Sequence, residues 1–372
     1  MRIVYFAPIY YDDLMQRPQQ IALQLARHHQ VVYVEPTVCA MKYWLKGGKN
    51  FRGGKRKENN QLHIIRMNGF CTIHKSLEFF DFFGLNSISE YFQIRKIVRR
   101  ADILWVGYAG WYTLVRHFMK KPIVYDKMDR EDLLRGNIFL KFTIRRNVKS
   151  LERCARAVFL TSRKLRDKSL VRHDNVYVVP NAVSEDFIPK ENEGKIYFGK
   201  ISKIQKIGYV GTIADWFDFD VIYELLKMEE KYEIFLIGNN FSPYMRHERL
   251  HYSKARPHSE LASCLFEFDL CLYNFKKGSL LDTINPVKLY EYLSANKPVL
   301  AVRSPETERF QKYLRLYDYP SEVPQIIRKD WQTPFENEKQ RQRFVRRNSW
   351  ESRGRRVECV LHRVVLCEDG LQ

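Results

Sequence analysis

Apolar runs typical of β-strands alternate with helical patterns along most of the chain, and this alternation limits the possible folds more than any other feature. It begins with a strand at residues 2–8, a helix at 17–29 that starts around Pro18, and a strand at 30–36. Such a β-α-β unit places its two strands parallel in one sheet. The pattern continues with strands at 103–108, 122–129, 155–162 and 175–183. We therefore expect a doubly wound α/β domain.

A second series of strands follows a charged break in the pattern. Residues 185–195 lose the hydrophobic period and gain charge, which is typical of a linker. Strand-like runs then return at 206–213, 232–238, 268–275 and 297–302. We divide the chain into domains at 1–190 and 191–345 and a C-terminal segment at 346–372. A ligand cleft is expected between two such domains, at the carboxyl ends of their strands.

The charge of the chain is concentrated in its N-terminal half. The formal net charge is +20; residues 1–180 hold 33 Lys and Arg against 15 Asp and Glu, whereas the rest holds 30 against 28. The N-terminal half is therefore expected to meet an anionic partner, either nucleic acid or the headgroups of anionic lipids.

Two basic segments with aromatic residues favour lipid over nucleic acid. Residues 46–57 are glycine-broken and basic, with Trp44 and Phe51 as possible membrane anchors, and residues 76–100 place four phenylalanines before a helix that ends in basic side chains. Those phenylalanines could instead be core residues. No apolar run approaches the roughly 20 residues that span a bilayer. We predict a cytoplasmic protein, peripherally bound to the inner face of the cell membrane, and no nucleic-acid partner.

Several common sites have no sequence signature here. There is no G-x-G-x-x-G after the first strand, no Walker sequence and no G-x-S-x-G, so dinucleotide-dependent, P-loop and α/β-hydrolase chemistry have little support. The seven cysteines show no metal-binding spacing. We expect neither a metal nor a cofactor.

A lysine stands where a helix disfavours it, in the segment DTINPVKLYEYLSANKPVLAV at residues 282–302. Asn285 is expected to cap this helix and Pro286 to open it, which places Lys288 near the third position. A cation there opposes the helix dipole at a cost of up to about 1 kcal/mol. A bound anion would explain it; a solvated pair with Glu291 is the alternative.

The ordered segments RPQQIALQLARHHQVVYVEP, VYDKMD, VYVVPNAV, IGYVGTI and NPVKLYEYLSANKPVLA resemble GT-B glycosyltransferases of the family-4-like type, closest to teichuronic-acid or capsule-assembly enzymes. The resemblance implies a GT-B fold: two Rossmann-like domains facing a central cleft, with a C-terminal helix that crosses back to the N-terminal domain. It also implies transfer of a sugar from a nucleotide-sugar donor, with UDP expected, to a lipid-linked or growing glycan acceptor.

The same resemblance suggests the donor site. Lys288 and the N–H groups around Val287 and Leu289 would hold the diphosphate without a metal, and Glu291 would hold the ribose. Gly211 and Thr212 would let the backbone approach the donor phosphates. Asn285, before the helix, is counted with the donor-binding residues.

The chain departs from the family pattern in two places. Thr283 stands where a sugar-contacting glutamate is usual, and ADWFDFD follows GYVGTI where a basic pair is usual. Stereochemistry is therefore open. An inverting enzyme needs a general base; Asp129 is our candidate, with Asp126 and Asp12 as competitors. A helix N-cap is the alternative role of Asp129.

Arg17 precedes Pro18 at a helix start and is a candidate for binding a phosphate of the acceptor or donor, with Asp12 beside it. A salt bridge from Arg17 to Asp12 or Asp13 is the alternative. Three other functions remain open at this stage: a catalytically silent GT-B scaffold, a nucleic-acid-binding protein, and a nucleotide-sugar epimerase on the same fold.

Overall fold

The computed structural model describes residues 1–13, 15–39, 54–69, 85–131, 138–167, 175–184, 187, 196–256 and 258–369. The chain divides into unit 1, Met1–Pro180 with Arg353–Gln372, and unit 2, Asn181–Ser352. The division falls at Pro180 and Asn181 instead of the predicted 190 and 191. The reason is hydrogen bonding inside unit 2: the Asn181 N–H donates to Asn285 Oδ1 at 2.9 Å, and the Val183 N–H donates to the Asn348 carbonyl at 2.8 Å.

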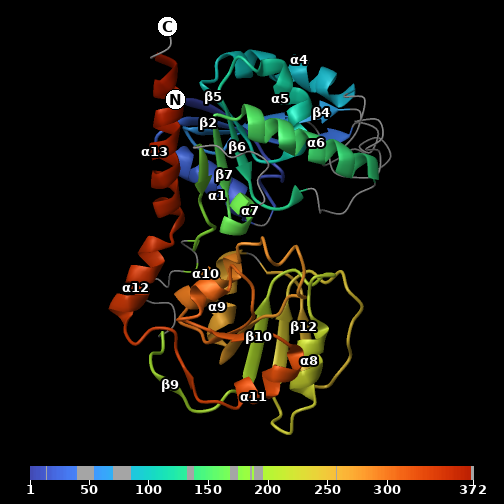
Figure 1. Ribbon diagram of the computed structural model, residues 1–372, viewed down its shortest axis with the longest axis vertical. Coiled ribbons are helices and arrows are strands. Elements are labelled where there is room, and N and C mark those ends of the chain that lie inside the picture. Colours follow the sequence, from blue (N-terminus) through green and yellow to red (C-terminus); the bar gives the residue numbers. More distant parts are fainter. Residues whose placement is uncertain are drawn as a thin grey trace. The chain divides into compact units, whose positions relative to one another are not determined.

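Within the described part of the chain, unit 1 contains an eight-stranded sheet with the order β3-β4-β2-β1-β5-β6-β7-β8 (Figure 1). All neighbouring strands are parallel except the antiparallel pair β3 and β4. The strands are β1 Arg2–Phe6, β2 Gln30–Cys39, β3 Gly54–Lys57, β4 Leu62–Gly69, β5 Ile103–Val106, β6 Ile123–Lys127, β7 Ala157–Leu160 and β8 Val176–Val178. The predicted parallel α/β sheet is confirmed.

Three neighbouring strands of this sheet are buried along their whole length. Every residue of β5, β6 and β7 is buried, because helices cover both faces of a parallel sheet. The helical elements of unit 1 are α1 Arg17–Leu25, α4 Leu85–Arg99, η1 Ala109–Trp111, α5 Tyr112–Val115, η2 Arg116–Phe118, α6 Ile138–Cys154, α7 Arg163–Asp167 and most of α13 Trp350–Asp369. Gly354 lets α13 approach α1, because a Cβ there would lie 2.8 Å from Gln24 Cβ.

Unit 2 contains, among its described residues, a six-stranded parallel sheet with the order β12-β11-β10-β13-β14-β15. Its strands are β10 Lys206–Val210, β11 Glu233–Ile237, β12 Leu250–Ser253, β13 Leu270–Tyr273, β14 Val299–Val302 and β15 Arg315–Tyr317, and β9 Lys200–Ile201 pairs separately with β16 Trp331–Gln332. The helical elements are α8 Phe219–Leu226, α9 His258–Phe266, α10 Val287–Ser294, η5 Glu308–Phe310, η6 Pro320–Glu322, α11 Val323–Ile327 and α12 Glu338–Arg347.

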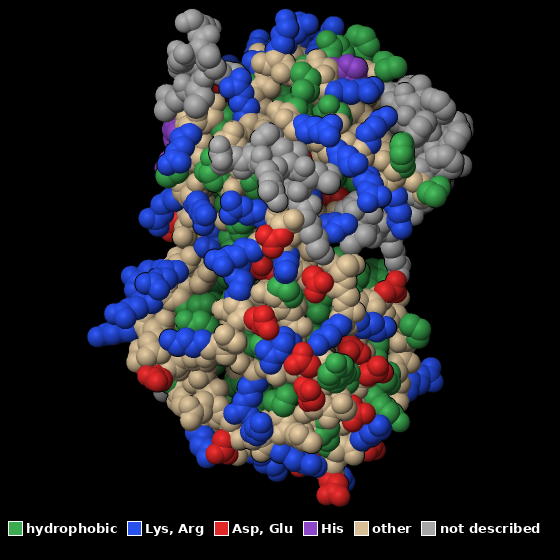
Figure 2. Space-filling view, viewed as in Figure 1, with side chains coloured by type: hydrophobic (Ala, Val, Ile, Leu, Met, Phe, Trp, Pro, Cys, Tyr) green, Lys and Arg blue, Asp and Glu red, His purple; other side chains and the backbone are tan. Residues whose placement is uncertain are grey.

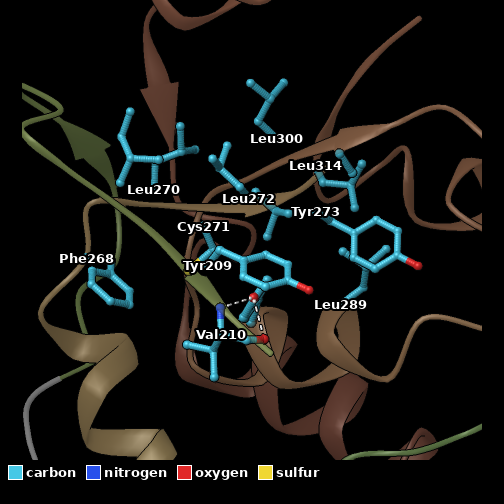
Figure 3. Packing of buried hydrophobic residues seen from close by; sticks show 14 of the residues in the cluster. Tyr209, Val210, Phe268, Leu270, Cys271, Leu272, Tyr273, Leu289, Leu300 and Leu314 are labelled. Atoms are coloured by element: carbon cyan, nitrogen blue, oxygen red, sulfur yellow. Dashed lines mark hydrogen bonds between the residues drawn. The ribbon is translucent and has the colours of Figure 1, made fainter. Parts of the chain in front are cut away.

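The core of unit 2 packs α10 against the sheet. Leu289 from the helix and Leu272 from β13 are fully buried, and Figure 3 shows them close to Tyr209 of β10. The Tyr292 hydroxyl lies 3.0 Å from the Val210 N and 3.4 Å from the Val210 carbonyl oxygen. This hydroxyl ties the last residue of β10 to the middle of α10, which helps to fix the position of the helix N-terminus.

The two segments predicted to contact a membrane are only partly described. Residues 46–53, Trp44 and residues 76–84 lie outside the described residues. Residues 54–57 were expected to continue a loop, but they form the edge strand β3, in which Lys55 pairs with Ile65 and Lys57 with His63 of β4. The other described half, α4, is a helix as predicted.

Candidate donor site and carboxylates

The N-terminus of α10 lies beside the carboxyl end of β10. The helix begins at Val287 with Pro286 as its N-cap, so the prediction that Asn285 caps it is wrong by one residue. The Asn285 side chain instead accepts a hydrogen bond from the Asn181 N–H and donates to Glu306 at 2.9 Å. Lys288 is therefore the second residue of the helix, still within the turn where the dipole disfavours a cation.

The Lys288 side chain is half-buried and lies over Gly211. A Cβ on Gly211 would come within 2.2 Å of both Cε and Nζ of Lys288, and Nζ is 5.8 Å from the centroid of the Tyr209 ring. Burial lowers the pKa of Lys288, and the negative charge of Glu291 opposes this shift. No hydrogen bond or ion pair joins the ammonium to another residue that the structure describes. A desolvated cation with this placement is suited to an anion.

Two glycines shape the backbone beneath that ammonium. Gly211, after β10, has φ 151° and Gly238, after β11, has φ 155°, values that favour glycine. A Cβ on Gly238 would lie 2.0 Å from the Gly211 carbonyl oxygen. Thr212 follows Gly211, and its carbonyl accepts the Tyr209 hydroxyl at 2.9 Å. The sequence prediction named Gly211 and Thr212 but not Gly238, whose signal is a glycine directly after a strand.

The other predicted donor residues, in the first turns of α10, differ in their burial and in the hydrogen bonds of their N–H groups. Val287 is at its first position, where the helical pattern supplies no acceptor for the N–H groups. Leu289 is fully buried, and its N–H donates to the Pro286 carbonyl at 3.2 Å. The Leu289 side chain is therefore a core residue, and its N–H, which was predicted to help hold the diphosphate, already has a backbone acceptor. Glu291 is buried three residues after Lys288, on the same side of the helix.

Glu306 is a carboxylate that sequence reasoning missed. It follows β14, is 1% exposed, accepts from Asn285 Nδ2 and pairs with Arg309 at 2.7 Å. Its position at the carboxyl end of a parallel strand was the available signal. Thr283 does not replace the usual glutamate chemically: it is fully buried and its hydroxyl donates to the Leu280 carbonyl at 3.0 Å.

Arg17 and Asp126 form a buried ion pair inside unit 1. The Nη2 of Arg17 lies 2.8 Å from Asp126 Oδ1, its Nε lies 3.1 Å from both carboxylate oxygens, and its Nη1 donates to the Val179 carbonyl at 2.8 Å. A salt bridge was an expected alternative, but its acid is Asp126 and not Asp12 or Asp13. This geometry does not support phosphate binding by Arg17 or catalysis by Asp126, because each already satisfies the other.

Asp12 is exposed and paired with Arg56, whose guanidinium donates two hydrogen bonds of 2.6 Å. The hydrogen bonds from Arg56 lower the pKa of Asp12, which makes this carboxylate a poor base. Asp12 therefore does not fit the role of competing base.

Asp129 lies just after β6, at the carboxyl end of the strand, where a cleft-lining base was predicted. It is half-buried; burial raises its pKa, and the charge of Arg17 lowers it. The helix that Asp129 was alternatively expected to cap extends into residues 132–137, which lie outside the described residues. Glu131, missed from sequence, is buried, accepts the Ala109 N–H at 2.7 Å and the Tyr125 hydroxyl at 2.8 Å, and has its pKa raised to about 7 by burial.

The described ranges contain neither a cluster of metal ligands nor a membrane-spanning helix. No group of three or more His, Cys, Asp or Glu side chains among these residues could hold a metal ion. None of the helices they form has both the length and the apolar character needed to cross a bilayer.

Comparison with known sequences finds a curated relative at low identity. No family model matches the chain. TuaH of Bacillus subtilis (strain 168), provisionally described as a teichuronic acid biosynthesis glycosyltransferase, is 23% identical over 237 residues, which is 58% of this chain. The match spans 59% of the relative's own length.

Solved structures resemble the chain over nearly its whole length. Sucrose-phosphate synthase from Thermosynechococcus elongatus superposes with a TM-score of 0.70 at 11% identity, covering 99% of this chain and 100% of that one. Anabaena HepE in complex with UDP and glucose gives 0.63 at 12%, covering 97% and 99%. The UDP-forming α,α-trehalose-phosphate synthase from Burkholderia xenovorans, in complex with glucose-6-phosphate, also gives 0.63 at 12% with the same coverage. These likenesses establish the fold.

Proposed function

We propose that this chain, which has the GT-B fold, is a glycosyltransferase that moves a sugar from a nucleotide-sugar donor to an acceptor hydroxyl. The observation that carries the proposal is the desolvated ammonium of Lys288 over Gly211, at the N-terminus of α10. In the reaction, the bond between the anomeric carbon and the diphosphate oxygen breaks and a bond to the acceptor oxygen forms. The diphosphate leaves with added negative charge, which Lys288 and the first N–H groups of α10 stabilise.

We assign the remaining donor contacts to unit 2 and propose UDP as the nucleotide. Gly211 and Thr212 provide close backbone approach to the phosphates, and Glu291 accepts the ribose hydroxyls. Asn285 and Glu306 hold the start of the helix and are positioning residues. UDP is favoured because HepE and the trehalose-phosphate synthase carry UDP or are UDP-forming. No metal is required in this scheme, because Lys288 supplies the positive charge.

We propose Asp129 as the base that takes the proton of the acceptor hydroxyl. Its raised pKa supports this role, because a base works best when its pKa is close to the working pH. Glu131 is the competitor, but both of its carboxylate oxygens already accept hydrogen bonds. A general base that deprotonates the acceptor corresponds to inversion at the anomeric carbon, and Thr283 in place of a glutamate agrees with it.

We propose a lipid-linked or growing glycan as the acceptor, at the inner face of the cell membrane. The support is the partial likeness to TuaH and the excess of cations in the N-terminal half. The structural neighbours named above are a sucrose-phosphate synthase, a trehalose-phosphate synthase and HepE with UDP and glucose, so the acceptor is proposed from the likeness to TuaH and from the charge, and not from these structures.

The test is calorimetric titration with UDP, GDP and CMP in the absence of divalent metal. Wild-type protein should bind one nucleotide saturably, and Lys288→Ala and Glu291→Ala should each weaken that binding at least tenfold. A Lys276→Ala variant, which removes an exposed lysine of the same unit, serves as the control. No binding of any nucleotide by wild-type protein would overturn the transferase proposal in favour of a catalytically silent scaffold.

A further inference from the structure

Three adjoining elements of unit 1 form one continuous surface: α4, the α5–η2 segment and α6. The α5 helix contacts both α4 and α6, and the Tyr91 ring of α4 stacks on Phe118 of η2 with 5.1 Å between centroids. Figure 1 shows α4, α5 and α6 on the same side of the sheet. We call the solvent side of these elements the α4–α6 face.

The exposed side of α6 is apolar at its beginning and cationic after it. Ile138 is 77% exposed and Phe142 is 63% exposed, four residues apart. Arg146 and Lys149 continue the same stripe at helical spacing and are exposed. The opposite side of the helix is buried against the unit's core through residues such as Ile144, Val148 and Leu151.

The α4 helix repeats this arrangement. Ile88 is 58% exposed and Phe92 is 61% exposed, again four residues apart, and Lys96 and Arg99 follow on the same side. The guanidinium of Arg95 lies 5.1 Å from the centroid of the Phe92 ring. Between the two helices, the segment after η2 exposes Met119 beside Arg116 and Lys120. Two separate helices therefore present the same combination of side chains.

No carboxylate balances the cations within these elements. The described helices α4, α5, η2 and α6 contain two acidic residues, Glu90 and Glu152, and both are buried. Glu90 accepts the Thr37 hydroxyl, and Glu152 pairs with Lys127 at 2.8 Å. In Figure 2, blue and green side chains are gathered over the part of unit 1 that these helices occupy, whereas red and blue are mixed over unit 2.

We propose that the α4–α6 face docks on the anionic surface of a lipid bilayer. The isoleucine and phenylalanine side chains would enter the headgroup region, and the arginines and lysines behind them would pair with anionic headgroups. Nucleic acid would account for the cations but not for exposed apolar residues at the start of each helix, because phosphate contacts need none. The inference rests on the proposed function only for what docking would achieve, because docking would bring the transferase to a membrane-bound acceptor.

The experiment is co-sedimentation of the full-length protein with vesicles. One set is phosphatidylcholine alone and the other is phosphatidylcholine and phosphatidylglycerol in equal parts. The apolar variant is Ile138→Ser with Phe142→Ser, and the charge variant is Arg146→Glu with Lys149→Glu. Matched controls in unit 2 are Phe241→Ser with Tyr244→Ser, which are also exposed, and Arg246→Glu with Arg343→Glu.

Wild-type protein should bind the anionic vesicles at least about tenfold better than the neutral ones, because each cation near the surface strengthens binding severalfold. The apolar and charge variants should each lose most of this binding, while both controls retain it and all keep their circular dichroism spectra. Binding by the two variants equal to wild type, or no vesicle binding by wild type, would overturn the proposal. A third outcome would also overturn it: duplex DNA displaces the protein from the vesicles, and the apolar variant binds both DNA and vesicles as tightly as wild type does.

The same samples separate this proposal from the proposed function. Titration with UDP reports only on the donor site in unit 2, and the face variants should leave it unchanged. Vesicle binding without UDP binding would leave the α4–α6 face supported and remove the transferase. UDP binding without vesicle binding would support the transferase and overturn the docking of the α4–α6 face.

Discussion

The smallest residue of the candidate donor site carries a strong geometric constraint. Gly211 combines φ 151° with a position where a Cβ would collide with Lys288. We expect Gly211→Ala to weaken UDP binding at least tenfold and to destabilise the protein by about 1–3 kcal/mol, because alanine strains the backbone and displaces the ammonium. Titration and urea unfolding measure the two effects. Gly278→Ala is the control, since nothing lies within 4 Å of its added Cβ; equal behaviour of the two variants would contradict the prediction.

In the protein without bound nucleotide, the Lys288 side chain should lower the free energy of unfolding. Burial lowers its folded-state pKa below the unfolded value, so between these two pKa values the unfolded chain binds more protons and stability rises with pH. Below the folded-state pKa the full cost of burying the cation is present. We expect Lys288→Met to raise the free energy of unfolding at pH 7 by about 0.5–1 kcal/mol while abolishing UDP binding. Urea unfolding at pH 7 checks this, and a less stable variant would show that the ammonium has a stabilising partner.

At the scale of elements, the Arg17–Asp126 pair joins the start of α1 to β6 within unit 1. Removing one partner leaves a buried charge, so Arg17→Met or Asp126→Asn should each lower the free energy of unfolding by about 3–5 kcal/mol. The double variant Arg17→Met with Asp126→Leu should recover much of this loss. Urea unfolding of the three variants forms the test. Additive losses in the double variant would indicate that the charges do not compensate each other.

The strands and their parallel order were predictable, whereas the ion pairs were not. Runs such as ILWV and AVFL are apolar at successive positions, which indicates strands buried on both faces. Arg17 and Asp126, in contrast, are 109 residues apart, and nothing local shows which acid meets which base. The nearby Asp12 and Asp13 were therefore the natural but wrong partners. Strand β3 could not be predicted from the sequence for a similar reason. Its residues, GKRK, have low strand propensity, and they form a strand because they pair with β4.

The candidate site was also predictable only in part. Lys288 could be found because a cation in the first turn of a helix conflicts with the dipole, and such local conflicts often mark function. Gly238 and Glu306 offered only a weaker signal, their place after a strand, because their roles depend on the Gly211 carbonyl and on Asn285, which other parts of the chain supply. The sequence also could not show that the Leu289 N–H, one of the groups predicted to hold the diphosphate, donates to the Pro286 carbonyl.

At the scale of the molecule, unit 2 is continuous in sequence and unit 1 is not. Residues Asn181–Ser352 contain their own buried core, and they include the proposed donor residues, from Gly211 to Glu291. We therefore expect a fragment of residues 181–352 to unfold cooperatively in urea and to bind UDP with an affinity close to that of the whole chain. Circular dichroism and calorimetry measure these two properties.

A fragment of residues 1–180 should behave differently, because unit 1 also needs Arg353–Gln372. Without α13, the Pro180 carbonyl loses the Arg353 side chain, which donates to it at 3.1 Å, and the α1 surface around Gln24 that Gly354 covers is exposed. We expect this fragment to unfold at lower urea or to aggregate, and a 1–180 chain fused through a flexible linker to residues 353–372 to regain stability. If residues 1–180 alone were as stable as the fusion, α13 would be dispensable for unit 1; if 181–352 failed to bind UDP while the whole chain bound it, the donor site would require residues of unit 1.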